Sequence, residues 1–103
     1  MDKIAALREI LALDPNKSFA RYGLALELAN RGQTESALAE FDALLNRDPA
    51  YTAGYFMAAQ TLAGAGRSTE AVARLKTGIE WAKRDGNSHA ISEMQTLLDE
   101  LER

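Results

Sequence analysis

The chain has 103 residues, of which 47% are apolar, and a formal net charge of −3. This length and apolar content suit one globular domain with a modest core, and the 12 basic residues are scattered, so the concentrated positive face that binds nucleic acid is not expected. There are no cysteines, which excludes disulfides, thiol catalysis and thiolate metal sites and fits a cytoplasmic protein.

Residues that favour helices dominate the sequence, and breakers divide it into segments. In chain order, we predict helices at residues 2–13, 17–31, 35–47, 51–64, 69–84 and 88–102. Pro15 and Pro49 separate neighbouring segments because proline cannot continue a helix interior. Gly32 and Gly66 suit the left-handed conformation that ends many helices. No stretch alternates as a strand does, so the predicted fold is all-α.

The first segment, MDKIAALREILALDP, carries a charge every few residues and does not have the pattern of a signal peptide. The longest purely apolar run, residues 55–59, is far shorter than the ~20 residues of a membrane-spanning helix. We therefore expect neither export nor membrane insertion.

The middle of the chain repeats itself after 34 residues. Aligning residues 14–47 with residues 48–81 gives eight identities. The identical pairs are Asp14/Asp48, Pro15/Pro49, Ala25/Ala59, Leu28/Leu62, Ala29/Ala63, Gly32/Gly66, Ala37/Ala71 and Ala39/Ala73. Self-similarity at this period predicts stacked helical hairpins.

Side chains at helical spacing predict how the two helices of each hairpin pair. In the first repeat these residues are Leu24, Leu28, Ala37, Phe41 and Leu44. In the second repeat they are Leu62, Ala71, Leu75 and Gly78. The small residues let the two backbones approach closely, so a larger side chain at Ala71 is expected to overpack the core.

Polar residues beside the turns are candidates for helix caps. Thr34 and Ser68 are available to cap the helices that follow them, and Asn87 or Ser88 is available to cap the last helix.

Trp81 is expected to pack as a core residue. The last helix carries its apolar residues on one stripe and most of its acidic residues off it, which is typical of a capping helix. The stripe consists of Ile91, Met94, Leu97, Leu98 and Leu101.

The repeat resembles the tetratricopeptide repeat. The residues that carry the resemblance are Leu24, Leu28, Gly32, Ala37, Phe41 and Asp48–Pro49, and then Leu62, Gly66, Ala71 and Leu75. The family pattern has an aromatic residue early in the repeat. At this position the first repeat departs from the pattern with Arg21, and the second repeat has Tyr55. The resemblance implies an all-α, tetratricopeptide-like α-solenoid of antiparallel helix pairs, with about six helices.

This resemblance implies a single tetratricopeptide-like domain over residues 1–103. Residues 1–13 form the helix of an incomplete N-terminal repeat, with Leu7 and Leu11 as its packing residues. The remaining parts are repeat 1 at residues 14–47, repeat 2 at residues 48–81 and a C-terminal capping helix at residues 85–103. Because repeat stacks usually need about three units, another subunit is a candidate to complete the stack.

Residue types that carry chemistry are few. His89 is the only histidine, and with Glu93 it offers at most two metal ligands on one helix face, so a solvated role is favoured. Adjacent carboxylates such as Asp99 and Glu100 point apart on a helix. The serines have no base nearby in the pattern, and GAGRST lacks the spacing and the lysine of a phosphate loop. We predict no enzymatic activity, metal, cofactor or small-molecule substrate.

One apolar stripe exceeds what the predicted core requires, because Phe19, Tyr22 and Leu26 lie roughly opposite the core leucines of their helix. In tetratricopeptide proteins the first helices of successive repeats line a concave groove, so the resemblance implies a peptide-binding groove here. Its predicted residues are Phe19, Tyr22, Leu26, Asn30, Phe56, Gln60, His89 and Ser92. The Lys/Asn/Arg set with which some members clamp a C-terminal carboxylate is missing.

The leading functional hypothesis is a non-catalytic interaction module, or scaffold, whose groove binds an apolar peptide or amphipathic helix of another protein. The alternative is a homo-oligomerising structural or assembly protein, such as a homodimer, that uses the same apolar face. A third reading is that the helix at residues 2–13 or the neighbouring first helices of the repeats cover part of the stripe.

Overall fold

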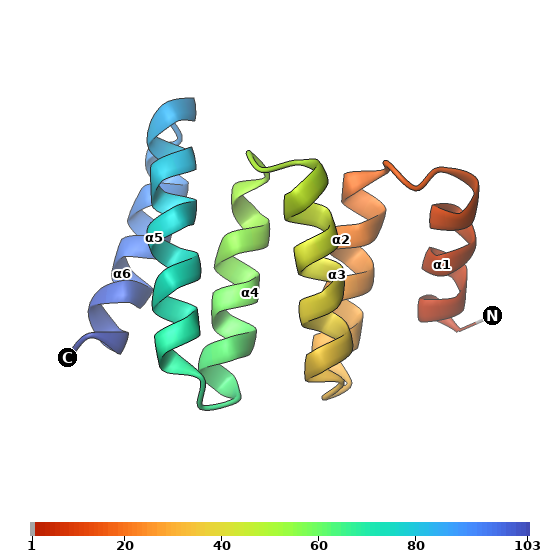
Figure 1. Cartoon of the computed structure of the whole chain (residues 1–103), viewed down its shortest axis with the longest axis horizontal. Helices are drawn as coiled ribbons and strands as arrows, with labels where there is room; N and C mark the ends of the chain where they lie inside the picture. The colour runs from red at the N-terminus through yellow and green to blue at the C-terminus, as the bar shows by residue number, and fades with distance from the viewer. Residues whose placement is uncertain (1) are drawn as a thin grey trace. The chain divides into compact units, whose positions relative to one another are not determined.

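A computed structural model describes residues 2–103 of the chain. The described residues form six α-helices: α1 (Lys3–Leu13), α2 (Ser18–Asn30), α3 (Thr34–Arg47), α4 (Thr52–Gly64), α5 (Ser68–Asp85) and α6 (Ser88–Leu101). The predicted all-α fold is confirmed, and each predicted helix end lies within one residue of the observed one. The chain divides into two compact units, Met1–Asp48 with α1–α3 and Pro49–Arg103 with α4–α6 (Figure 1).

The turns follow the predicted breakers. Pro15 and Pro49 each lie between two helices. Gly32 and Gly66 end α2 and α4 with positive φ angles of 76° and 77°, a conformation that costs a glycine nothing because it has no Cβ. In the first of these turns the Gln33 N–H donates to the Leu28 carbonyl at 2.9 Å, which satisfies a carbonyl that the helix end would leave unpaired.

The predicted capping by Thr34 and Ser68 is wrong. Helices α3 and α5 begin at these residues, and the cap positions fall to Gln33 and Arg67, which make no side-chain cap hydrogen bond. The predicted cap of the last helix is confirmed for Asn87, whose Oδ1 accepts from the Ala90 N–H at 3.1 Å. A shift of one residue in helix start is enough to change which side chain can reach the free N–H groups.

In the first unit, α2 contacts both α1 and α3. The predicted packing residues of the α2–α3 hairpin are all buried, namely Leu24, Leu28, Ala37, Phe41 and Leu44. On α1, Leu11 is buried and Leu7 is half-buried. The first unit therefore consists of a tight hairpin with one further helix against its α2 side.

In the second unit, α5 contacts α4 and α6, and α4 also contacts α6. The predicted packing residues Leu62, Ala71 and Leu75 are buried, as are Gly78 and, from α6, Met94. The capping role of α6 is consistent with this arrangement: its buried residues are Met94 and Leu98, and its acidic residues are exposed. Each helix of this unit touches the other two.

Trp81 is not the core residue that the sequence predicts. Its side chain is half-buried, and the guanidinium of Arg84 lies over the ring, 4.6 Å from the ring centre. A cation over the face of an indole is attracted by the ring quadrupole. Trp81 therefore has a polar neighbour at the surface instead of an apolar enclosure.

The departure from the family pattern at Arg21 has a structural explanation. In the second repeat the Tyr55 hydroxyl donates to the carbonyl of Pro49 at 2.8 Å. At the equivalent place in the first repeat, Arg21 donates to the carbonyl of Pro15 at 3.1 Å and forms an ion pair with Glu40 at 2.7 Å. The arginine thus supplies the hydrogen bond of the missing aromatic residue, and Glu40 balances its charge.

Within residues 2–103, none of the helices combines the length and the apolar character that crossing a membrane requires.

Candidate functional site

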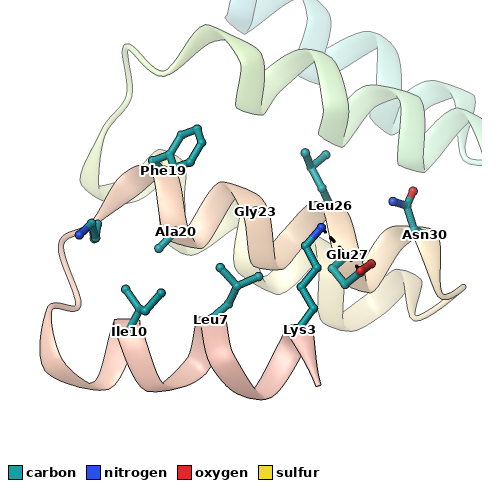
Figure 2. A pocket seen from close by; sticks show the side chains of 10 residues that line it. Lys3, Leu7, Ile10, Phe19, Ala20, Gly23, Leu26, Glu27 and Asn30 are labelled. Atoms are coloured by element: carbon teal, nitrogen blue, oxygen red, sulfur yellow. Dashed lines mark ion pairs between the residues drawn. The ribbon is translucent and has the colours of Figure 1, made fainter. Parts of the chain in front are cut away.

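The first unit contains an apolar groove between α1 and α2, with a volume of about 410 Å³ (Figure 2). Both helices supply its walls, and a charged or amide side chain lies at each end. The lining residues are Lys3, Leu7, Ile10, Lys17, Phe19, Ala20, Gly23, Leu26, Glu27 and Asn30.

Small residues on α2 let α1 come close and form the floor of the groove. Ala20 is buried, and Gly23 faces Leu7, whose methyl groups lie 3.7 and 3.9 Å from where a Cβ at Gly23 would be. Figure 2 shows Leu7 and Ile10 pointing from α1 toward α2. With Leu11 buried in the same contact, α1 rests on α2 and leaves the space beside them open.

The groove and its surroundings hold the exposed large apolar side chains of the described chain. Among residues 2–103 these are Ile10 at 40% exposure, Leu13 at 91% and Phe19 at 77%. Ile10 and Phe19 line the groove, whereas Leu13 lies one turn beyond Ile10 on α1. Exposed apolar groups of this size beside a groove are typical of a contact surface.

Charged side chains connect the two helices at the end of the groove where α1 begins. Lys3 Nζ lies 3.9 Å from Glu27 Oε1, and Arg31 Nη2 lies 2.6 Å from Asp2 Oδ1. The hydrogen bond from Arg31 lowers the pKa of the Asp2 carboxyl and raises the pKa of Arg31. Both groups are exposed, so solvent screens the pair and its contribution to stability is small.

The structure brings together three of the predicted groove residues, since Phe19, Leu26 and Asn30 all line the α1–α2 groove. Tyr22 is half-buried on α2 and does not line it. The other four predicted residues belong to the second unit and stay a prediction. They are Phe56 and Gln60 on α4 and His89 and Ser92 on α6.

Sequence reasoning left open that the helix at residues 2–13 covers part of the stripe, but it did not assign residues of α1 to the groove. Lys3, Leu7 and Ile10 were not predicted to line a groove, although α1 gives a signal. Its apolar residues are distributed around the helix, yet only Leu11 is buried. A helix that is apolar on several sides needs more than one packing partner.

His89 is 85% exposed, and its Nε2 lies 3.3 Å from Glu93 Oε1. In the described part of the chain no three side chains of His, Cys, Asp or Glu come together as a metal site would require.

A family model described as tetratricopeptide repeat matches residues 28–94, which is more than half of the sequence. The chain belongs to the tetratricopeptide repeat family. It is similar to a TPR repeat-containing protein of Pseudomonas aeruginosa, with 27% identity over 100 residues that cover 97% of this chain and 95% of that protein.

Two solved structures show the same fold. A tetratricopeptide repeat domain protein from Salinibacter ruber is 31% identical, with a TM-score of 0.81 and coverage of 86% of this chain and 90% of that one. The TPR2B domain of yeast Sti1, in a complex with pHsp70, is 17% identical with a TM-score of 0.89 and coverage of 96% and 79%. The second likeness shows the fold alone.

Proposed function

We propose that this chain is a non-catalytic protein-interaction module whose α1–α2 groove binds an apolar peptide, or the apolar face of an amphipathic helix, from another protein. Membership of the tetratricopeptide repeat family supports an interaction role. The complex of the yeast Sti1 domain with pHsp70 is an example of a protein with this fold in such a role. The chemistry of the groove supports an apolar ligand.

The observation that carries the proposal is the exposure of Phe19 in a groove whose middle is lined by apolar residues. Its side chain is 77% exposed, and Ile10, Leu7 and Leu26 line the same space. Burying a phenylalanine side chain is favourable by about 1.5–3 kcal/mol. A ligand that covers Phe19 and Leu26 therefore gains affinity without first displacing a packed neighbour.

The spacing of the apolar residues favours a helical ligand. Phe19 and Leu26 are seven residues apart on α2, which is about 10.5 Å along the helix axis at 1.5 Å per residue. A ligand helix with apolar anchors at i, i+3 or i+4, and i+7 presents its side chains over the same length. Lys3 and Lys17, which also line the groove, favour acidic residues beside those anchors.

The test is to select ligands from a displayed library of random peptides with the purified protein. We expect the selected peptides to share apolar residues at the i, i+3 or i+4, i+7 spacing, and we expect Phe19→Asp to weaken their binding by about tenfold or more. Leu13→Lys is the matched control because it also charges an exposed apolar residue, but outside the groove lining. The negative charge of Phe19→Asp lies at the N-terminus of α2, and the positive charge of Leu13→Lys lies at the C-terminus of α1. Both charges are therefore favourable in the field of the helix dipole.

The helicity of both variants, measured by circular dichroism, is expected to equal that of the wild type because Phe19 and Leu13 are exposed. Peptides that bind Phe19→Asp as tightly as the wild type would contradict the proposed groove. Loss of binding by the Leu13→Lys control alone would move the binding surface away from the groove.

A further inference from the structure

Helix α1 has an edge beside the groove that carries two exposed apolar side chains, Ile10 and Leu13. Lys3, Ala6, Ile10 and Leu13 follow one another at intervals of three, four and three residues, so they share one side of the helix. Ile10 lines the groove (Figure 2). Leu13 is 91% exposed. Helix α6 differs, because its exposed residues are mainly polar.

We propose that a second copy of this chain occupies the groove, with α1 of each subunit lying antiparallel to α1 of the other in a two-fold symmetric dimer. The inference rests on the proposed function, because it requires the groove to accept an apolar helix, and it names one such helix. In a two-fold interface the same surface is used on both subunits, so the edge and the groove must complement themselves.

The order of side chains along the edge is self-complementary only in the antiparallel direction. With the symmetry axis near the middle of α1, the small Ala6 lies opposite Ile10 of the partner subunit, and Lys3 lies opposite Leu13 of the partner subunit. A parallel pair would instead place Lys3 against the partner's Lys3 and leave a gap between the two Ala6 side chains. Large-against-small pairing fills space, and like charges repel.

The charges around the groove favour the same arrangement. Asp14 directly follows Leu13 and is exposed. Lys3 lies at the opposite end of α1; its Nζ is 3.9 Å from Glu27 Oε1, and its side chain is 70% exposed, so it can also take a second carboxylate. The antiparallel dimer brings Asp14 of the partner subunit to Lys3, and the symmetry repeats this pair at the other end. Leu13 of the partner subunit then covers the part of the groove beside Leu26, and a foreign ligand has to compete with it.

The first measurement is sedimentation equilibrium of the wild type from about 5 μM to about 500 μM, which detects dissociation constants in the micromolar range. We expect a monomer–dimer equilibrium within this range. Leu13→Lys is expected to weaken the dimer by about tenfold or more, since it removes the protruding apolar group and adds a charge near Lys3 of the partner subunit. Ala39→Lys, an equally charged change at an exposed position of α3, should leave the equilibrium unchanged.

The second measurement tests the direction of the pair and uses the absence of cysteine in the chain. Ala6→Cys and Ile10→Cys proteins are mixed, oxidised and analysed by mass. The antiparallel dimer predicts that the cross-linked species contains one chain of each variant. Cross-links within one variant only would overturn the antiparallel arrangement.

A wild type that stays monomeric at 500 μM, or a Leu13→Lys variant that dimerises as strongly as the wild type, would overturn the dimer. These outcomes leave the proposed function standing if Phe19→Asp still loses peptide binding. Conversely, Leu13→Lys is expected to weaken the dimer and to retain, or improve, peptide binding. The test of the dimer and the test of peptide binding can therefore fail independently of each other.

Discussion

At the scale of single residues, Gly78 decides how closely the helices of the second unit approach. A Cβ at this position would lie 2.6 Å from Met94 Sδ and 2.6 Å from Tyr55 Cβ. The second neighbour is fixed to the α4 backbone and cannot swing aside. The bare backbone of Gly78 therefore allows α4, α5 and α6 to meet at one point.

We predict that Gly78→Ala lowers the free energy of unfolding by about 1–2 kcal/mol, because the overpacking cost exceeds the gain of about 1 kcal/mol in helix propensity. Urea denaturation monitored by circular dichroism measures the change. The matched control is Gly64→Ala in α4, where a Cβ would have nothing within 4 Å and should be neutral or stabilising. Equal effects of the two variants would contradict the close approach at Gly78.

At the scale of elements, α1 is held less firmly than its neighbours. It contributes one buried residue, Leu11, and its contacts within the first unit are with α2. The Asp2–Arg31 pair joins the start of α1 to the end of α2, but exposed ion pairs are worth little. The opening of α1 therefore exposes less apolar surface than the opening of the α2–α3 hairpin.

We predict that amide hydrogens of α1 exchange at least about tenfold faster than those in the middle of α2 and α3. Native-state hydrogen exchange measured by NMR at low protein concentration tests this. Repeating the experiment at high concentration is informative, since the proposed dimer would slow exchange in α1 and leave α3 unchanged. Protection of α1 equal to that of α2 at low concentration would show that Leu7 and Leu11 hold it more firmly than its burial indicates.

At the scale of the whole molecule, the two compact units each have a core of their own. In the unit Pro49–Arg103 every helix contacts the other two, whereas in the unit Met1–Asp48 helix α2 contacts α1 and α3, which form no comparable contact with each other. We expect the closed arrangement of three helices to be the more stable one.

We predict that a fragment of residues 49–103 melts cooperatively and at a higher temperature than a fragment of residues 1–48. Both fragments are near the lower size limit for independent folding, so their melting temperatures should lie below that of the whole chain. Thermal circular dichroism compares the three proteins. A fragment 49–103 without a cooperative transition would contradict an independent core in the second unit.

The sequence determined where the helices begin and end, because Pro15, Pro49, Gly32 and Gly66 act on the backbone locally and need no partner. It also determined the packing of each hairpin, since apolar residues such as Leu24, Leu28 and Phe41 lie at helical spacing within a repeated unit.

Only the tertiary structure decided which part of the apolar stripe forms a groove. Leu7 and Ile10 come from α1, and Phe19 and Leu26 come from α2, so the site depends on the contact between two helices whose pairing no local pattern encodes. The same holds for Arg21, which fits its repeat because Glu40, nineteen residues later, lies within reach of its charge. Helix formation follows from neighbours along the chain, whereas exposure and partnership depend on neighbours in space.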